Sequence, residues 1–508
     1  MAAAMDMLSP IRASHDSKGI AMEDPSPGTR HHTLLSSNDA PSDSDIAFIQ
    51  SVLAETDRRL QSFHEEIQNL KLQPQAESAV SSGILQRLEE ERTCLLAFGA
   101  RNRAILSPLR RIPPELLREI FFLTLPPLAH GLDAKKFDLG VSPWLLTHVC
   151  GLWRVVSLSM PSLWSQIAID YHYSDSSNYY SLRVAETQLR RASLLKIHFY
   201  SSEIMDAGLQ LEMFNLLASQ CSRWEELSIG LTSIIAPSLL LPLRNRLPSL
   251  HRLSLEVSHP PSTGTSELQC LDCFDSAPSL IDFECYSLLP ITLPVEQFVR
   301  YELNALWERH LQILNQASNL VEARIQIAFQ GDADWPDLPA HAVNLVHLRR
   351  LFVSHGFALR YLRAPDLEQL ALVDNLDSMT SLTSCFRPFV SSSSCQIRRL
   401  ILGSPSAATL VEILKCASYI TELVIIEDKD SDTVDDVFES LEASGYILAP
   451  QLTLIFLACT DLFRIHYTPF LKMLESRWTP GGQRFAPSST RHSSWTAGIN
   501  RAAQLSMG

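Results

Sequence analysis

The chain has 508 residues, 46% hydrophobic and 19% charged, so it is long enough for two or three domains with a substantial core. Its net charge of −14 argues against generic binding to nucleic-acid phosphates. The N-terminus lacks the apolar core of a secretory signal, and no apolar run reaches membrane-spanning length. The ten cysteines are scattered beside apolar residues, which favours reduced thiols in an intracellular protein of the cytoplasm, the nucleus or both.

A polar tail and two apolar seams occupy the N-terminal part. Residues 1–44 show no apolar period, which predicts disorder. Residues 45–106 carry two heptad-like seams separated by Pro74, which predicts two helices with the character of a coiled coil. The first seam comprises Ile46, Ile49, Leu53, Thr56, Leu60, Phe63, Ile67 and Leu70, and the second comprises Ile84, Leu88, Glu91, Leu95, Phe98, Asn102 and Ile105. The two helices either fold back as a hairpin or associate with another copy of the chain.

Residues 107–165 predict a short helical module. Pro113-Pro114-Glu115 is a helix start, because proline suits the first turn and glutamate suits its positive end. Ser142-Pro143 predicts the start of a second helix, which Met160-Pro161 ends. Two helices of this size cannot bury all their large apolar side chains, so the module either binds a partner or packs on the domain that follows. These side chains are Leu116, Leu117, Ile120 and Phe121 in the first helix and Trp144, Leu145, Val149, Leu152, Trp153 and Val156 in the second.

The module resembles the F-box of fungal F-box proteins. Three separated pieces carry the resemblance in the same order: IPPELLxxIF from Ile112, VCxxWR from Val149 and PxLW from Pro161. Gly151-Leu152 departs from the basic residues often found there. The resemblance implies binding to a Skp-type adaptor, and through it to a cullin-RING ubiquitin ligase. The adaptor-binding residues that it implies are Ile112, Pro113, Pro114, Glu115, Leu116, Leu117, Ile120, Phe121, Leu146, Val149, Cys150 and Trp153.

Residues 166–475 repeat one apolar motif, a large apolar residue followed by apolar residues three and five positions later. Its central position recurs at residues 167, 197, 227, 253, 283, 323, 351, 370, 400, 423 and 455. This irregular period resembles degenerate leucine-rich repeats, which predicts an α/β solenoid with one strand per repeat and a curved binding face. Helices are expected between the strands, at Met213–Ser219, Glu302–Gln316 and Ala408–Cys416.

The last residues, 476–508, form a basic tail. They contain Arg477, Arg484, Arg491 and Arg501 and no acidic residue. Their content of Pro, Gly and Ser predicts disorder.

The chain shows none of the common enzyme motifs, so no catalytic residue, cofactor or metal is expected. Cys270 and Cys273, with Cys285 nearby, have half of a zinc spacing, but buried or loop thiols fit better. The acidic stretch Asp428–Glu439 has oxygen side chains at calcium-loop positions, but Thr433 replaces the glycine of the tight turn. A solvated acidic loop fits that stretch better.

The favoured hypothesis is an F-box substrate receptor without catalytic activity, whose repeats bind an unidentified protein substrate. Neither nucleic acid nor a membrane is an expected partner. One alternative is a coiled-coil and F-box scaffold with no role in ubiquitination, which self-association through the N-terminal helices would favour. Another is an enzyme with an unrecognised site.

Overall fold

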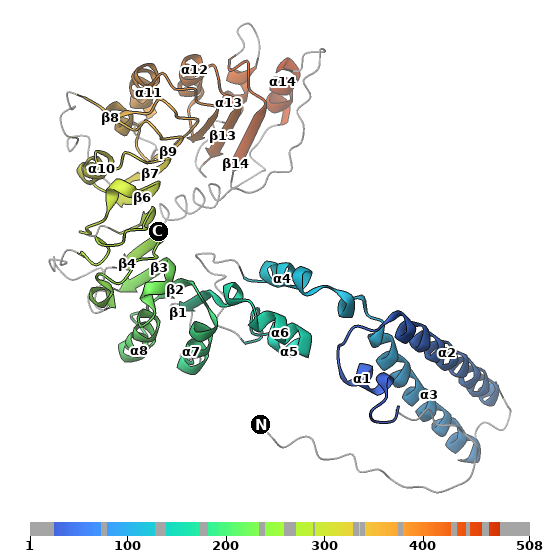
Figure 1. Ribbon diagram of the computed structural model, residues 1–508. Coiled ribbons are helices and arrows are strands. Elements are labelled where there is room, and N and C mark those ends of the chain that lie inside the picture. The colour runs from blue at the N-terminus through green and yellow to red at the C-terminus, as the bar shows by residue number, and fades with distance from the viewer. Residues whose placement is uncertain are drawn as a thin grey trace. The chain divides into compact units, whose positions relative to one another are not determined.

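The computed structural model describes residues 25–72, 79–126, 139–171, 181–232, 239–258, 271–287, 290–328, 335, 341–373, 379–427, 434–442, 448–459 and 467–477 (Figure 1). These residues form two compact units, the first ending at Trp164 and the second beginning at Ser165. The first unit is helical and the second alternates strands with helices, which confirms the predicted mixed α/β class. No helix within the described ranges is both long and apolar enough to cross a membrane.

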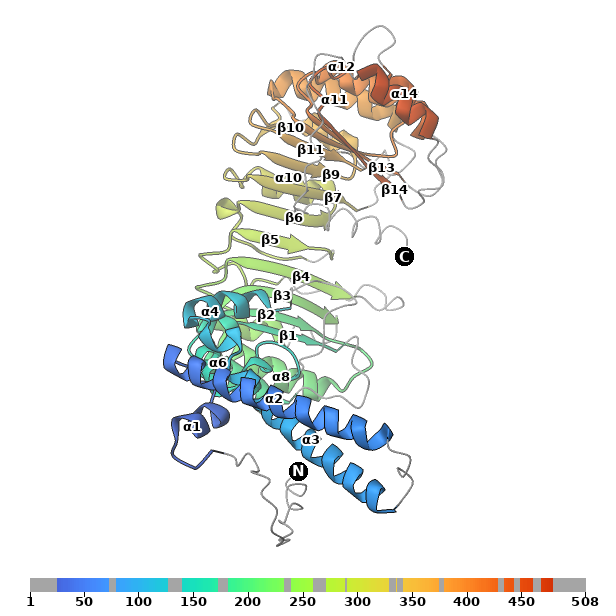
Figure 2. The ribbon, with the colours of Figure 1, turned by 90° about the vertical axis from the view of Figure 1, so that its right-hand side faces the viewer.

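Two long helices, α2 (Asp43–Leu72) and α3 (Ala79–Ile105), pair within the chain (Figure 2). Arg103 Nη2 of α3 lies 2.6 Å from Asp57 Oδ1 of α2. All eight predicted seam positions of α2 are buried or half-buried, whereas Ile84 of the α3 seam is exposed. The two seams face each other, as the hairpin alternative predicts. Five α3 seam positions are buried: Leu88, Leu95, Phe98, Asn102 and Ile105.

A third helix, α1 (Arg30–Ser36), corrects the prediction of disorder for the whole of residues 1–44. Its Leu34 is buried against the hairpin, and its His31 Nε2 lies 2.6 Å from the side-chain oxygen of Asn102. This contact explains a polar residue in the α3 seam. A seven-residue helix with one apolar pair has no measurable period, so pattern reasoning missed it. Residues 1–24 lie outside the described residues.

The short helical module consists of η1 (Pro108–Arg111), α4 (Pro114–Leu123), α5 (Leu146–Val149), α6 (Gly151–Leu158) and η2 (Pro161–Trp164). The first helix starts at Pro114, as predicted. The prediction of one continuous helix from Ser142 to Met160 is wrong, because Cys150 takes an extended conformation (φ −161°, ψ 171°) that separates α5 from α6. The Cys150 sulfur then accepts the Trp153 N–H at 3.5 Å and caps α6.

The second unit is built on one sheet of twelve parallel strands (Figures 1 and 2). The strands follow chain order from edge to edge, but β8 and β10 are left out, so β9 lies between β7 and β11. The strands are β1 (Gln166–Asp170), β2 (Leu195–Tyr200), β3 (Trp224–Thr232), β4 (Arg252–Ser258), β5 (Asp282–Cys285), β6 (Arg300–Ala305), β7 (Glu322–Ile327), β9 (Arg350–Val353), β11 (Gln369–Leu372), β12 (Arg399–Gly403), β13 (Glu422–Glu427) and β14 (Leu454–Cys459). The skipped strand β8 (Val343–Asn344) pairs with β10 (Leu362–Arg363) in a separate small sheet.

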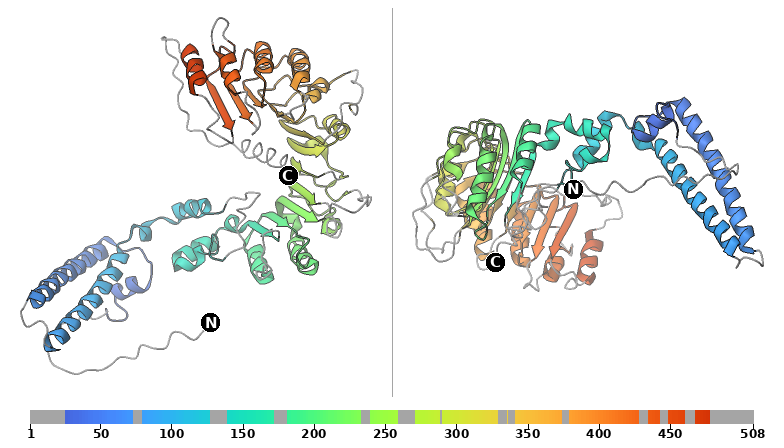
Figure 3. Two further views of the ribbon diagram at one scale, coloured as in Figure 1. Left: turned by 180° about the vertical axis from the view of Figure 1, so that it is seen from behind. Right: turned by 90° about the horizontal axis from the view of Figure 1, so that it is seen from below.

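The described helices of this unit lie along one face of the sheet (Figures 1 and 3). The α-helices are α7 (Leu182–Arg191), α8 (Ala207–Ala218), α10 (Trp307–Leu314), α11 (Met379–Ser393), α12 (Ala407–Cys416), α13 (Val434–Leu441) and α14 (Tyr467–Arg477). Four 3-10 turns accompany them: η3 (Cys221–Arg223), η4 (Leu241–Leu243), η5 (Val295–Gln297) and η7 (Gly356–Tyr361). Arg477 donates hydrogen bonds to Leu441 O and Leu448 O, which corrects its assignment to a disordered tail. Residues 478–508 lie outside the described residues.

The central residues of the predicted motif stand in register across the sheet and form what we call the central row. Nearly all of them are almost completely buried on the helix-covered face. Successive apolar side chains therefore contribute one core along the whole unit, as in a solenoid. The row is Ile167, Ile197, Leu227, Leu253, Phe283, Tyr301, Ala323, Leu351, Leu370, Leu400, Leu423 and Ile455.

Strand β6 is the strand that the sequence pattern missed. It lies inside the unusually long step between the motifs centred on Phe283 and Ala323, and it removes the first residues of the helix predicted at Glu302–Gln316. The motif spacing was present at Phe298, Tyr301 and Leu303. The Phe298 ring stacks on that of Phe283, with centroids 5.7 Å apart.

His310 of α10 is buried behind the sheet. Its Nε2 lies 3.0 Å from Gln326 O, which can only accept, so Nε2 donates. Its Nδ1 lies 2.7 Å from the Tyr301 hydroxyl. Burial lowers the pKa of His310 to about 4, although the carbonyl groups of Gln326 and Ala305 favour the charged form. The imidazole is therefore neutral at pH 7.

Acid should destabilise the second unit through His310. The pKa of His310 is about 4 in the folded chain and 6.5 in the reference state. The contribution of the neutral imidazole to the free energy of unfolding is therefore fully present above pH 6.5 and is lost as the pH falls towards 4. At pH 5 the loss should be about 2 kcal/mol. We expect urea unfolding at pH 7 and pH 5 to show a smaller pH effect in His310→Gln than in the wild type. Equal pH dependence in both proteins would contradict this assignment.

Candidate functional site

The first helix of the module, α4, has a buried side and an exposed apolar side. Leu117 and Phe121 are buried, and the Phe121 ring packs 4.9 Å from the Trp153 ring of α6. Leu116 and Leu117 are adjacent in sequence, so the helical rotation of about 100° per residue points them in different directions. The motif therefore contributes Leu117 to the core and Leu116 to the surface.

The last motif piece, at η2, packs on the end of α6. Trp164 is fully buried, and its indole N–H donates to Ser157 O at 2.9 Å. Its ring lies 5.0 Å from the Trp144 ring, with the planes at 85°. An edge-to-face aromatic pair of this kind stabilises a small core beyond the area that it buries. The three separated motif pieces thus come together in one helical core.

The twelve residues implied by the resemblance divide by exposure. Leu117, Phe121 and Leu146 are core side chains, so they support the surface and do not form it. Ile112, Cys150 and Trp153 are half-buried. The exposed members, which are free to contact a partner, are Pro113, Pro114, Glu115, Leu116, Ile120 and Val149.

An apolar stripe runs along the exposed side of α4. Leu116, Ile120 and Leu123 recur at i, i+4 and i+7 and are 57%, 43% and 83% exposed. We call these three residues the α4 stripe. Pattern reasoning missed Leu123, although its spacing from Leu116 places it on the same side. Among the described residues, the same module exposes seven further large apolar side chains: Leu109, Phe122, Leu139, Leu145, Val149, Val155 and Leu158. Large exposed apolar patches are typical of protein-docking surfaces.

The face of the sheet opposite the helices, here called the second face, carries charges of alternating sign at one register position. Arg252 Nε lies 2.6 Å from Asp282 Oδ2, and Glu322 lies between Arg300 and Arg350 at 3.5 and 3.3 Å. Each charge therefore has opposite charges beside it, and the row attracts no ion of one particular sign. The row reads Lys196, Glu226, Arg252, Asp282, Arg300, Glu322, Arg350, Gln369, Arg399 and Glu422.

A second register position on this face is polar from β2 to β7 and apolar from β9 onward. Its charged residues are Glu284 on β5, Glu302 on β6 and Arg324 on β7. Burial raises the pKa of Glu302, while Arg324 opposes this shift. From β9 to β13 the position is apolar and buried, in a cluster that we call the apolar strip. The strip is Phe352, Ala371, Ile401 and Val424, with Val373 and Ile426 packed against it.

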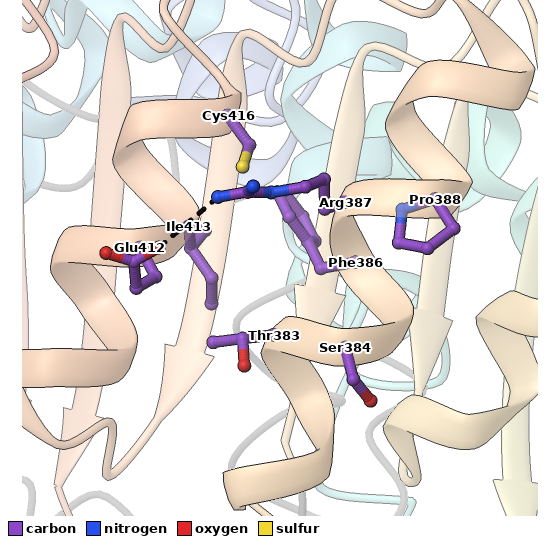
Figure 4. A pocket seen from close by; sticks show the side chains of 8 residues that line it. All are labelled: Thr383, Ser384, Phe386, Arg387, Pro388, Glu412, Ile413 and Cys416. Carbon is purple, nitrogen blue, oxygen red and sulfur yellow. Dashed lines mark hydrogen bonds and ion pairs between the residues drawn. The ribbon is translucent and has the colours of Figure 1, made fainter.

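One pocket lies between α11 and α12 on the helical side, with a volume of about 340 Å³ (Figure 4). Arg387 Nη2 and Glu412 Oε2 are 3.3 Å apart in it, so its two opposite charges neutralise each other. The pocket lining contains a thiol, Cys416, but no histidine that could act as its base. This geometry does not support nucleophilic catalysis in the pocket.

The described residues contain no group of three or more His, Cys, Asp or Glu side chains that could hold a metal ion. Cys273 and Cys285 are buried, and burial raises the pKa of each thiol to about 12. Cys270 lies outside the described residues, as do residues 428–433 of the acidic stretch. The rest of that stretch begins the helix α13, and the element before it is the strand β13.

Comparison with known proteins gives no match: no protein-family model and no curated protein matches the chain. The resemblance to F-box proteins therefore rests on the three motif pieces of the sequence. The likeness to leucine-rich repeats rests on the register of the parallel strands.

Core and surface positions of α4 should respond differently to truncation. Phe121→Ala removes a fully buried ring beside Trp153 and should destabilise the first unit by about 3–5 kcal/mol. Leu123→Ala, at an 83% exposed position two residues away, should change stability by less than about 0.5 kcal/mol. Urea unfolding of the full chain would measure both. A similar loss in both variants would show that α4 is oriented differently.

Proposed function

We propose that the chain is a non-catalytic F-box substrate receptor whose first unit binds a Skp-type adaptor. The observation that carries the proposal is the exposed α4 stripe on the module that resembles an F-box. Burying such Leu and Ile side chains contributes about 1.5–3 kcal/mol each. Through the adaptor the chain would join a cullin-RING ubiquitin ligase, and ubiquitin transfer would belong to the other subunits.

The second unit is proposed to bind the protein substrate. Extended parallel sheets in solenoids provide long binding faces, and the second face has both alternating charges and apolar side chains. Alternating charges favour a partner with a complementary sequence of charges over any generic polyanion or polycation. The described cysteines have free thiols, which fits the proposed intracellular location.

A scaffold role through self-association is the second candidate. The hairpin exposes Phe48, Leu72, Ile84 and Leu96, although α2 and α3 already pair within the chain. Two hairpins could bury these side chains against each other. Sedimentation of the full chain would distinguish a monomer from such a dimer.

Charge on the α4 stripe should abolish adaptor binding. In Leu116→Arg/Ile120→Arg the substituted positions are exposed in the free chain, so the fold should tolerate them. Burying two unpaired guanidinium groups at an apolar interface should weaken binding by at least about 100-fold. Titration of the host's Skp-type adaptor against both proteins would measure the loss.

Ile204→Arg is the matched control, because Ile204 is a highly exposed apolar residue of the second unit. It should bind the adaptor like the wild type. If the folded wild-type chain does not bind the adaptor, the receptor proposal is wrong. If the stripe variant binds normally, the α4 stripe is not the docking surface.

A further inference from the structure

The apolar strip is buried on a face of the sheet that the described helices do not cover. Phe352, Ala371, Ile401 and Val424 are each at most 5% exposed. The helices lie along the opposite face, where the central row forms its own core (Figures 1 and 3). A parallel sheet that is apolar on both faces requires a cover on both.

The next residue in the same register position shows what an uncovered side chain looks like. Phe456 on β14 pairs in register with Val424, but it is 45% exposed at the edge of the sheet. Another segment therefore covers the strip and shields it from water. An exposed patch of this composition would otherwise favour association with another chain.

We infer that the C-terminal segment of this chain, residues 478–508, docks along the second face and covers the apolar strip. The segment follows α14 directly, at the end of the unit where the strip lies. Its 31 residues span at most roughly 100 Å when extended. Seven strand spacings separate β14 from β5, a distance of roughly 34 Å, so the segment can reach the whole face.

The composition of the segment suits this face. It offers large apolar side chains for the strip, and it has no acidic residue that would oppose binding near Glu284 and Glu302. Glu284 lies farther from α14 than the apolar strip does. An arginine late in the segment, such as Arg501, can therefore meet the half-buried Glu284 after the earlier aromatic side chains have reached the strip. Glu302, by contrast, already pairs with Arg300 and Arg324. The large apolar side chains are Trp478, Phe485, Trp495, Ile499, Leu505 and Met507.

A docked segment would also occupy the face to which the protein substrate is proposed to bind. A ligand of the second face would then have to displace residues 478–508 first. Such a built-in competitor lowers the apparent affinity of every ligand of this face by the same factor, which is set by the undocked fraction. This inference does not depend on adaptor binding by the first unit.

Limited trypsin digestion of the full chain tests the inference, because Arg484, Arg491 and Arg501 lie within the segment. Mass spectrometry would follow cleavage after Arg501. In the wild type this cleavage should be at least roughly tenfold slower than in a synthetic peptide of residues 478–508, because only the undocked fraction is cut. Trp495→Ser/Ile499→Ser should restore the rate of the peptide, while the matched control Ser493→Ala/Ser506→Ala should not.

A variant of the face makes the test specific. Val373→Asp places a charge beside the strip at a half-buried position, and it should also accelerate cleavage after Arg501. Cleavage of the wild type at the peptide's rate would overturn the inference; a dimer in sedimentation would then identify a second copy as the cover. Slow cleavage that is insensitive to both Val373→Asp and the Trp495/Ile499 variant would also overturn it, because the segment would then rest elsewhere.

Discussion

The second unit depends on one constraint, the register of its central row. Ile167, Ile197 and the residues that follow them stand opposite one another, so each strand completes the core of its neighbour. At the C-terminal edge Ile455 has only one such neighbour and remains half-buried. Stability in such an array comes from contacts between adjacent repeats, and its ends are the weak positions. A slip of one residue would turn the apolar row towards the other face.

The alternating charges on the second face support the same register. Asp282 lies between Arg252 and Arg300, with nearest atoms 2.6 and 3.9 Å apart, so correct pairing brings opposite charges together. Burial raises the pKa of Asp282, and both arginines oppose that shift. Ion pairs with a partly exposed partner, such as Arg252 here, add little net stability. A misaligned strand would lose these pairings, so we expect the row to contribute more to the specificity of the register than to the free energy of folding.

The sequence predicted what depends on side-chain periodicity and missed what depends on the backbone. Eleven strands of the main sheet coincide with the apolar motif, because a half-buried strand shows its period directly. The break at Cys150 and the strand β6 were missed, because Cys150 interrupts no apolar pattern and β6 follows its neighbour unusually closely. In the helical module the motif predicted a set of binding residues, but only packing, such as that of Phe121 against Trp153, separates core from surface.

The side-chain pattern changes from the early strands to the later ones, which explains why the second face is polar in one half of the sheet and apolar in the other. Early strands alternate, as in Lys196-Ile197-His198, where one face is polar. Later strands are continuously apolar, as in Leu400-Ile401-Leu402 and Leu423-Val424-Ile425. Alternation is typical of a sheet with one solvated face, and continuous apolar runs are typical of strands buried on both. The need for a second cover is therefore encoded in the strands themselves, and only the C-terminal half of the sheet has it.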